Sequence, residues 1–178
     1  MILLRGALAT HTEQLEGVAT ETFTTTDDLA EKLERLAKQQ PEVGAVFHAA
    51  AVSDFAAGAV LQKNDKGELT PLRQGKVSTR EGSLLLELRP TQKIISHLRG
   101  WFSNVQLVGW KYEVDGDRAS ALGQALRQLT DNATDVCVVN GPAYGDGFGL
   151  LKKEGEAAEH LANGEALFDA LARLAKRD

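Results

Sequence analysis

Apolar runs that suit β-strands alternate along this chain with segments whose leucines recur at helical spacing. The expected strands are Met1–Arg5, Val43–Phe47, Val105–Gly109 and Val136–Val139. The helical stripes are Leu29, Leu33, Leu36 and Ala37, then Leu122, Leu126 and Leu129, and finally Leu167, Leu171 and Leu174. Such alternation is typical of βαβ units. We therefore expect an α/β fold with a mostly parallel sheet.

The ends of these helices carry recognisable signals. Thr26 or Asp27 is expected to cap the first helix and Asn163 the last, because a hydroxyl, carboxylate or amide oxygen accepts the unpaired N–H groups there. Pro41 is expected to stop the first helix.

Residues 58–89 lack helical periodicity. Asn64–Gly67 predicts a turn and Leu84–Leu88 a strand. This stretch is longer than a simple connection between a strand and a helix requires. We expect one domain over residues 1–178 with an inserted antiparallel flap at about 58–89, which covers a ligand or pairs with a second subunit. The glycine-rich segment Gly141–Gly149 is predicted to be an irregular loop.

Composition excludes several classes of function. The 178 residues carry a net charge of −5 without a cluster of lysines and arginines, which argues against a nucleic-acid groove. The single cysteine, Cys137, leaves no disulfide framework and no cysteine metal cluster. No apolar run reaches bilayer length, and no signal peptide is recognisable. We expect a cytoplasmic protein without nucleic-acid or membrane partners.

A run of alanines follows the expected strand Val43–Phe47, in the segment His48-Ala-Ala-Ala-Val-Ser-Asp-Phe55. Ligands of parallel α/β sheets bind where the strands end. The methyl side chains of Ala49, Ala50 and Ala51 would let a nucleotide or phosphate approach the backbone, with Asp54 beside it. The alternative is a tight turn in which Asp54 only caps a helix.

Two further segments could bind phosphate. In Gly75-Lys-Val-Ser-Thr79, Lys76 could stabilise charge on a triphosphate, or be a solvated flap lysine. In the second segment, Pro90 or Thr91 is predicted in the first turn of a helix that buries Ile94, Ile95 and Leu98. Free N–H groups at such a helix start favour an anion, although an ordinary capped helix has the same pattern.

A third strand end, Val108–Glu113, places Trp110 where its ring could border a base or ribose, or where it could belong to the core. No Gly-x-Gly-x-x-Gly fingerprint and no Walker loop follows an expected strand. Neither Tyr112 nor Tyr144 has a lysine four residues later, which excludes the Tyr-x-x-x-Lys pair of short-chain dehydrogenases.

Taken in this order, the segments resemble phosphopantothenate-cysteine ligase, which in bacteria often forms the C-terminal half of a bifunctional flavoprotein. The matching segments are Ala49–Phe55, Gly75–Thr79, Pro90–Ile94, Val108–Trp110, Glu113 and Asp135–Asn140. The resemblance covers nearly the whole chain and implies a Rossmann-like three-layer fold.

The resemblance also implies a reaction in coenzyme A biosynthesis. The carboxylate of 4'-phosphopantothenate attacks the α-phosphate of ATP or CTP with Mg²⁺, and the cysteine amine then displaces the nucleotide from the acyl-nucleotide. It implies Lys76 as the catalytic residue, no dedicated metal ligands, and a homodimer through the flap, where Leu84, Leu85, Leu86 and Leu88 are apolar on both faces. The nucleotide-binding residues that it implies are Ala49, Ala50, Ala51, Asp54, Lys76, Pro90, Thr91, Gln92, Lys93 and Trp110.

The chain departs from this family in three ways. Val77, Ser78 and Thr79 follow Lys76 where bacterial members often carry a lysine-rich stretch, which is more like the eukaryotic form. The family begins with a βα unit carrying a Gly-rich turn and a substrate-binding Asn segment, for which this sequence has no counterpart. Gln128 and Asn132 stand near positions where many members have lysines, with Arg127 as the nearest cation. We therefore expect a ligase whose first unit comes from a separate polypeptide, a longer natural start of the chain or a partner subunit. The alternative is a catalytically incomplete nucleotide-binding or assembly module of the same fold.

Overall fold

The largest sheet has five strands in the order β10-β9-β8-β7-β3. This computed structural model describes residues 1–40, 42–64, 66–72, 83–152 and 157–176. β3 (Ala45–His48), β7 (Gln106–Tyr112) and β8 (Val136–Asn140) pair in parallel, whereas β9 (Phe148–Leu151) and β10 (Glu159–Leu161) pair antiparallel. The α/β class is confirmed, but the sheet is mixed rather than mostly parallel. A parallel pair needs a long crossover, and only a short glycine-rich loop joins β8 to β9.

Two parallel strands, β1 (Ile2–Gly6) and β2 (Ala19–Phe23), form a separate small sheet. The strand predicted at Met1–Arg5 is confirmed with a shift of one residue. β2 was not predicted because threonine and glutamate interrupt its apolar pattern. Among the described residues, no backbone hydrogen bond joins β1 to β3.

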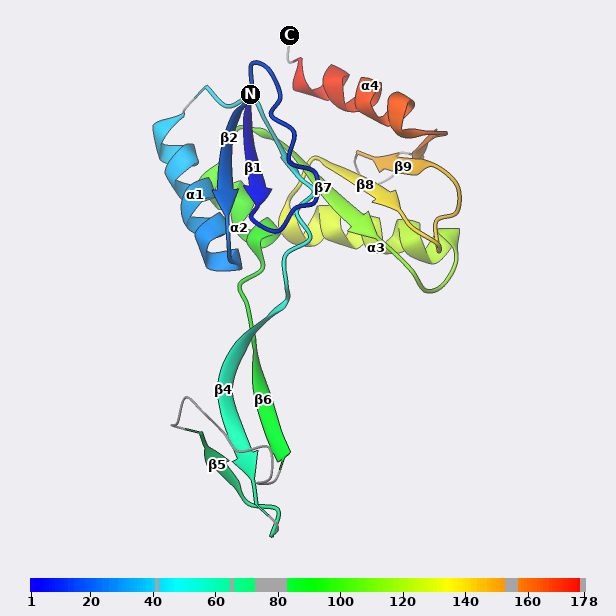
Figure 1. Cartoon of the computed structure of the whole chain (residues 1–178). Coiled ribbons are helices and arrows are strands. Elements are labelled where there is room, and N and C mark those ends of the chain that lie inside the picture. The colour runs from blue at the N-terminus through cyan, green and yellow to red at the C-terminus, as the bar shows by residue number, and fades with distance from the viewer. Residues whose placement is uncertain (41, 65, 73–82, 153–156, 177–178) are drawn as a thin grey trace.

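Helices cover both faces of the five-stranded sheet (Figure 1). α3 (Arg118–Asn132) packs on the face that contains Cys137 and Val139, and α4 (Gly164–Ala175) packs on the face of Val136 and Val138. α1 (Thr26–Gln39) and α2 (Ile94–Trp101) form a further cluster against Leu107 of β7. The order helix, sheet, helix gives three layers, and β8 is apolar because it is buried on both faces.

The predicted helices exist, with corrections to their details. Thr25, not Thr26 or Asp27, caps α1, and its hydroxyl accepts the Asp28 N–H at 3.1 Å. Asn163 caps α4 as predicted. Alanines dominate the buried stripe of α3, which consists of Ala121, Ala125, Leu129 and Asn132, while Leu122 and Leu126 are only partly buried beside it. Small side chains let α3 lie close to the sheet, which leaves less room for leucine.

An antiparallel arm of three strands projects from the body (Figure 1). β4 (Phe55–Lys63) lies between β5 (Leu69–Pro71) and β6 (Ser83–Pro90). The turn predicted at Asn64–Gly67 is present, since the Gly67 N–H donates to the Asn64 carbonyl at 2.9 Å. The arm begins at Phe55, slightly before the predicted bound of 58. Residues 73–82 of the predicted flap lie outside the described part of the chain.

The Gly141–Gly149 loop is anchored rather than free. Tyr144 is buried, and its hydroxyl accepts a 2.7 Å hydrogen bond from Arg118 at the start of α3. The Arg118 guanidinium carbon also lies 4.4 Å from the centroid of the Tyr144 ring. Phe148 and Gly149 already belong to β9, so the irregular segment is shorter than predicted.

In the described part of the chain, no helix has both the length and the hydropathy that crossing a bilayer requires.

Arg99, in the last turn of α2, connects this helix to the C-terminal end of α3 and to the loop that precedes β7. Its guanidinium donates to the Asp135 carboxylate at 2.8 Å and to the carbonyls of Ala133, Phe102, Ser103 and Val105. The same Asp135 oxygen accepts the Leu107 N–H at 2.7 Å. One side chain therefore satisfies several carbonyls left unpaired where two helices end.

We predict that Arg99→Ala lowers the free energy of unfolding by about 2–3 kcal/mol, because partly buried charged hydrogen bonds are lost and their acceptors are left without partners. Urea denaturation measures this change. Arg35→Ala is the control, since Arg35 pairs with Glu21 on the exposed face of α1 and should cost less than about 1 kcal/mol. Equal losses for both variants would contradict the role given to Arg99.

Candidate functional site

A cavity of about 640 Å³ opens where β3 and β7 end, bounded by the start of α2 and one face of α3. The carboxyl ends of parallel strands are the usual ligand sites of such sheets. Seven of the ten predicted nucleotide-binding residues line it: Ala49, Ala50, Ala51, Asp54, Gln92, Lys93 and Trp110. The fold therefore brings together segments that are far apart in the sequence.

The alanine segment forms one wall of the cavity. Ala49, Ala50 and Ala51 directly follow β3, and no regular element intervenes before Phe55. Thr91 holds the end of this segment, because its hydroxyl donates to the Ser53 carbonyl at 2.6 Å and its N–H donates to the Asp54 carbonyl at 2.9 Å. These contacts fix the end of the segment, and its three alanines line the cavity, although Ala50 also packs against the core.

Thr91 and Pro90 do not line the cavity, although both were predicted to bind nucleotide. Pro90 ends β6 and pairs with Phe55 across the base of the arm. Thr91 follows it and supports the Asp54 backbone. In this structure the two residues contact the backbone of the segment that lines the cavity, and so they position that segment without lining the cavity themselves.

The start of α2 faces the cavity. The helix begins at Ile94, later than predicted, and Lys93 occupies the N-cap position without a side-chain cap. N–H groups at a helix start attract anions. Gln92 lines the cavity too, although its amide donates to Asp27 of α1 at 2.7 Å. Ile94, Ile95 and Leu98 are buried as predicted.

Trp110 and Gln128 form the inner wall. The Gln128 side-chain amide has one orientation in which its nitrogen and its oxygen both find partners. In that orientation its N–H donates to the Trp110 carbonyl at 3.0 Å, and its oxygen accepts the Trp110 N–H at 3.3 Å. The Gln128 side chain reaches this position over Gly109, where an added Cβ would lie 2.2 Å from its Nε2. Gly109 is therefore required for this close approach. Trp110 also packs into the core beneath α4, which agrees with the interpretation of Trp110 as a core residue, while its contact with a base or ribose stays a prediction.

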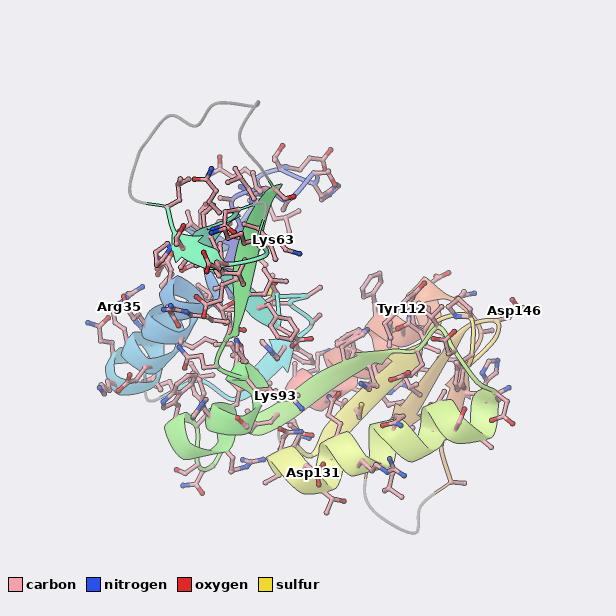
Figure 2. The ribbon with its side chains drawn as sticks, turned by 90° about the horizontal axis from the view of Figure 1, so that it is seen from below. Arg35, Lys63, Lys93, Tyr112, Asp131 and Asp146 are labelled. Carbon is pink, nitrogen blue, oxygen red and sulfur yellow. The ribbon has the colours of Figure 1, made fainter. Side chains whose placement is uncertain are left out.

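The cavity has mixed charge. Lys93 and Arg127 line it, and neither forms an ion pair within the described ranges. Lys111 is paired with Glu113 at 3.0 Å. Asp54 and Asp131 supply carboxylates. Figure 2 shows Lys93 at the start of α2 and Asp131 on the neighbouring helix α3. Two unpaired cations beside a helix start would suit a phosphorylated ligand.

Several residues of α3 line the cavity although the sequence did not predict them as site residues. Gln124, Arg127, Gln128 and Asp131 all line the cavity from one face of this helix. Their spacing of three or four residues is the signal that could have identified them. Gln128, Asn132 and Arg127 were noted in the sequence only as standing near positions where many members of the resembling family have lysines, and none was predicted to line the site.

His48, the last residue of β3, also lines the cavity and was not predicted as a site residue. Burial lowers the pKa of its imidazole below the ordinary value of 6.5. The side chain is therefore neutral at pH 7.

Lys76 lies outside the described residues. Within the described part of the chain, no group of three or more His, Cys, Asp or Glu side chains has an arrangement that could hold a metal ion.

Solved structures with this fold exist. No protein-family model matches the chain, and no curated protein does. The DNA/pantothenate metabolism flavoprotein of Streptococcus pneumoniae is 22% identical, with a TM-score of 0.78 over 97% of this chain and 78% of that one. The chain therefore shares the fold of that flavoprotein. The fold expected from the resemblance is confirmed.

Two further solved structures share this fold. The C-terminal domain of the coenzyme A biosynthesis bifunctional protein CoaBC is 19% identical, with a TM-score of 0.66 over 98% of this chain and 72% of that one. A Cab2 mutant in complex with phosphopantothenate-cysteine is 20% identical, with a TM-score of 0.61 over 89% of this chain and 53% of that one.

We predict that the folded chain loses stability as the pH falls below about 6.5. Below the ordinary pKa of 6.5 an unfolded His48 binds a proton, whereas the buried imidazole stays neutral until its lower folded pKa is reached, so acid favours unfolding. Thermal melts of the wild type and His48→Asn between pH 5 and 7.5 measure this. The variant should lose less stability on acidification, and identical pH profiles would contradict the assignment.

Proposed function

We propose that this chain is a nucleotide-dependent ligase that joins 4'-phosphopantothenate to cysteine through an acyl-nucleotide intermediate in coenzyme A biosynthesis. The observation that carries the proposal is the cavity at the ends of β3 and β7, lined by the alanine segment and the start of α2. It lies in a fold shared with a solved Cab2 complex with phosphopantothenate-cysteine.

The residues of the cavity suit the first step. When the pantothenate carboxylate attacks the α-phosphate, negative charge accumulates on the phosphate oxygens, and cations and N–H groups fixed nearby lower the barrier. Lys93 and the start of α2 are assigned to the triphosphate, and Lys76 to the phosphate being transferred. Mg²⁺ would arrive bound to the triphosphate with most of its water, so it needs no protein cage.

The alanine segment and Trp110 are assigned to the nucleoside. Ala49–Ala51 leave the backbone accessible, and Asp54 can accept hydrogen bonds from hydroxyl groups. Trp110 with its Gln128 partner borders the same space. Both ATP and CTP are candidates for the nucleotide. We propose that residues 1–178 act as one ligase-like domain with the arm as an insertion, in the cytoplasm, where the free Cys137 would remain reduced.

A further βα unit is proposed to complete the central sheet. β1 and β3 each have an edge that pairs with no other strand in the described ranges. Phe47 of β3 and Ile2 of β1 are exposed, although strands at the centre of an α/β sheet are normally covered. A strand from a further unit, whether in a separate polypeptide, a longer form of this chain or a partner subunit, could pair with both edges, and its helix could cover these side chains.

We predict that the chain with this added unit releases pyrophosphate from ATP or CTP in the presence of phosphopantothenate, and that Lys76→Ala lowers the rate about 100-fold or more. A coupled pyrophosphate assay measures both rates. Lys66→Ala, in the turn of the arm, is the matched control and should retain the wild-type rate.

The outcomes separate the two functional candidates. Nucleotide binding without pyrophosphate release would favour the alternative of an incomplete nucleotide-binding or assembly module. Unchanged activity of Lys76→Ala would reject the role of that lysine while leaving the ligase function in place.

The arm is proposed to form a homodimer interface. Every residue of β6 is exposed, including Leu84, Leu85, Leu86 and Leu88. A three-stranded sheet with apolar side chains exposed to water on both faces is an unfavourable arrangement, which a second copy of the arm would relieve.

We predict that the wild type is a dimer and that Leu86→Glu shifts it toward the monomer, because a carboxylate would be buried in the interface without a partner. Leu86 is 54% exposed in the single chain. Sedimentation analysis measures the change. Phe168→Glu on α4, where the side chain is 69% exposed, is the control and should leave the mass unaltered. A monomeric wild type would refute the interface.

A further inference from the structure

His48 occupies a position that the first step of the proposed reaction does not use. It ends β3, immediately before the alanine segment, and its side chain lines the cavity. Within the described part of the chain, its imidazole forms no hydrogen bond or ion pair, and residues of α2 and α3 line the same cavity. A ligand in the cavity could therefore reach a ring nitrogen that the protein has not engaged.

The register of the sheet places His48 on a defined wall. His48 pairs with Gly109 of β7, and paired residues of neighbouring strands face the same side. That side is the one from which Gln128 and Ile95 approach Gly109. Because Gly109 has no side chain, the space beside the imidazole is limited by the ends of Gln128 and Ile95 rather than by a neighbouring strand residue.

The other ionisable side chains that line this cavity are Asp54, Lys93, Lys111, Tyr112, Arg127 and Asp131. As chemical classes, ammonium and guanidinium ions have no free lone pair, and a carboxylate is a weaker base than an imidazole. Burial keeps His48 neutral, so its ring retains an accepting nitrogen.

The second step of the proposed reaction needs such an acceptor. When an amine attacks an acyl-nucleotide, the nitrogen becomes positively charged as the C–N bond forms, and it must lose a proton to give a stable amide. A positioned base contributes about 100-fold or more to such a step.

We propose that His48 is the general base that takes this proton. The inference rests on the ligase function proposed above. The amine nitrogen attacks the acyl carbon, the bond between that carbon and the phosphate oxygen breaks, and the nucleoside monophosphate leaves with the electron pair. The proton passes from the nitrogen to the ring of His48 and then to water.

Single-turnover measurements on the chain with its added first unit test this proposal. In His48→Asn, pyrophosphate release should stay within about twofold of wild type, whereas amide formation should slow about 100-fold and the acyl-nucleotide should accumulate. The matched control is His97→Asn, because His97 is exposed on α2 and stacks on Trp101 outside the cavity. Normal amide formation in a folded His48→Asn variant would overturn the proposal.

The pH profile of the wild type gives a second measurement that needs no variant. The rate of amide formation should fall on the acid side of pH 6.5, because a protonated imidazole accepts no proton, while pyrophosphate release should not share this limb. An amide step without an acid limb would overturn the role of His48. Absence of pyrophosphate release from wild type would instead reject the ligase function, and with it the base.

Discussion

The parallel pairing of β3, β7 and β8 is the constraint on which the site depends. Parallel strands end at the same edge of a sheet, so the residues after β3 and at the end of β7 must lie side by side. β8 supports this arrangement because it is buried on both faces, by α3 and by α4. Its apolar sequence is the direct consequence of that position.

The cavity exists because small residues occur where helices and strands meet. Gly109 lets Gln128 and Ile95 approach β7, and the alanine stripe brings α3 close to the sheet. The cavity wall after β3 is also alanine. Larger side chains at these positions would fill the space in which a nucleotide is proposed to bind. The residues that determine the packing are therefore also those that shape the cavity.

The structure separates two kinds of residue around the candidate site. Lys93, Arg127 and His48 line the cavity and make no recorded side-chain bond to the rest of the described protein, so they are available to a ligand. Thr91 is engaged with the backbone of the segment that lines the cavity, whereas Arg99 is engaged with carbonyls near the starts of β7 and β8, at the other end of these strands. A sequence pattern does not distinguish these roles, because threonine and arginine are as suitable for a phosphate as for a carbonyl oxygen.

Local periodicity and side-chain size were enough to predict the α/β class, the strands β3, β7 and β8, the cap of α4 at Asn163 and the burial of β8. The ligand-binding character of the alanine segment stays a prediction. Three features became apparent only in the folded structure: β9 and β10 pair antiparallel, the buried stripe of α3 contains Ala121 and Ala125 beside Leu129 and Asn132, and His48 and one face of α3 border the cavity. Those features arise from contacts between segments far apart in the chain. A local pattern of residues carries no information about which distant face it will meet.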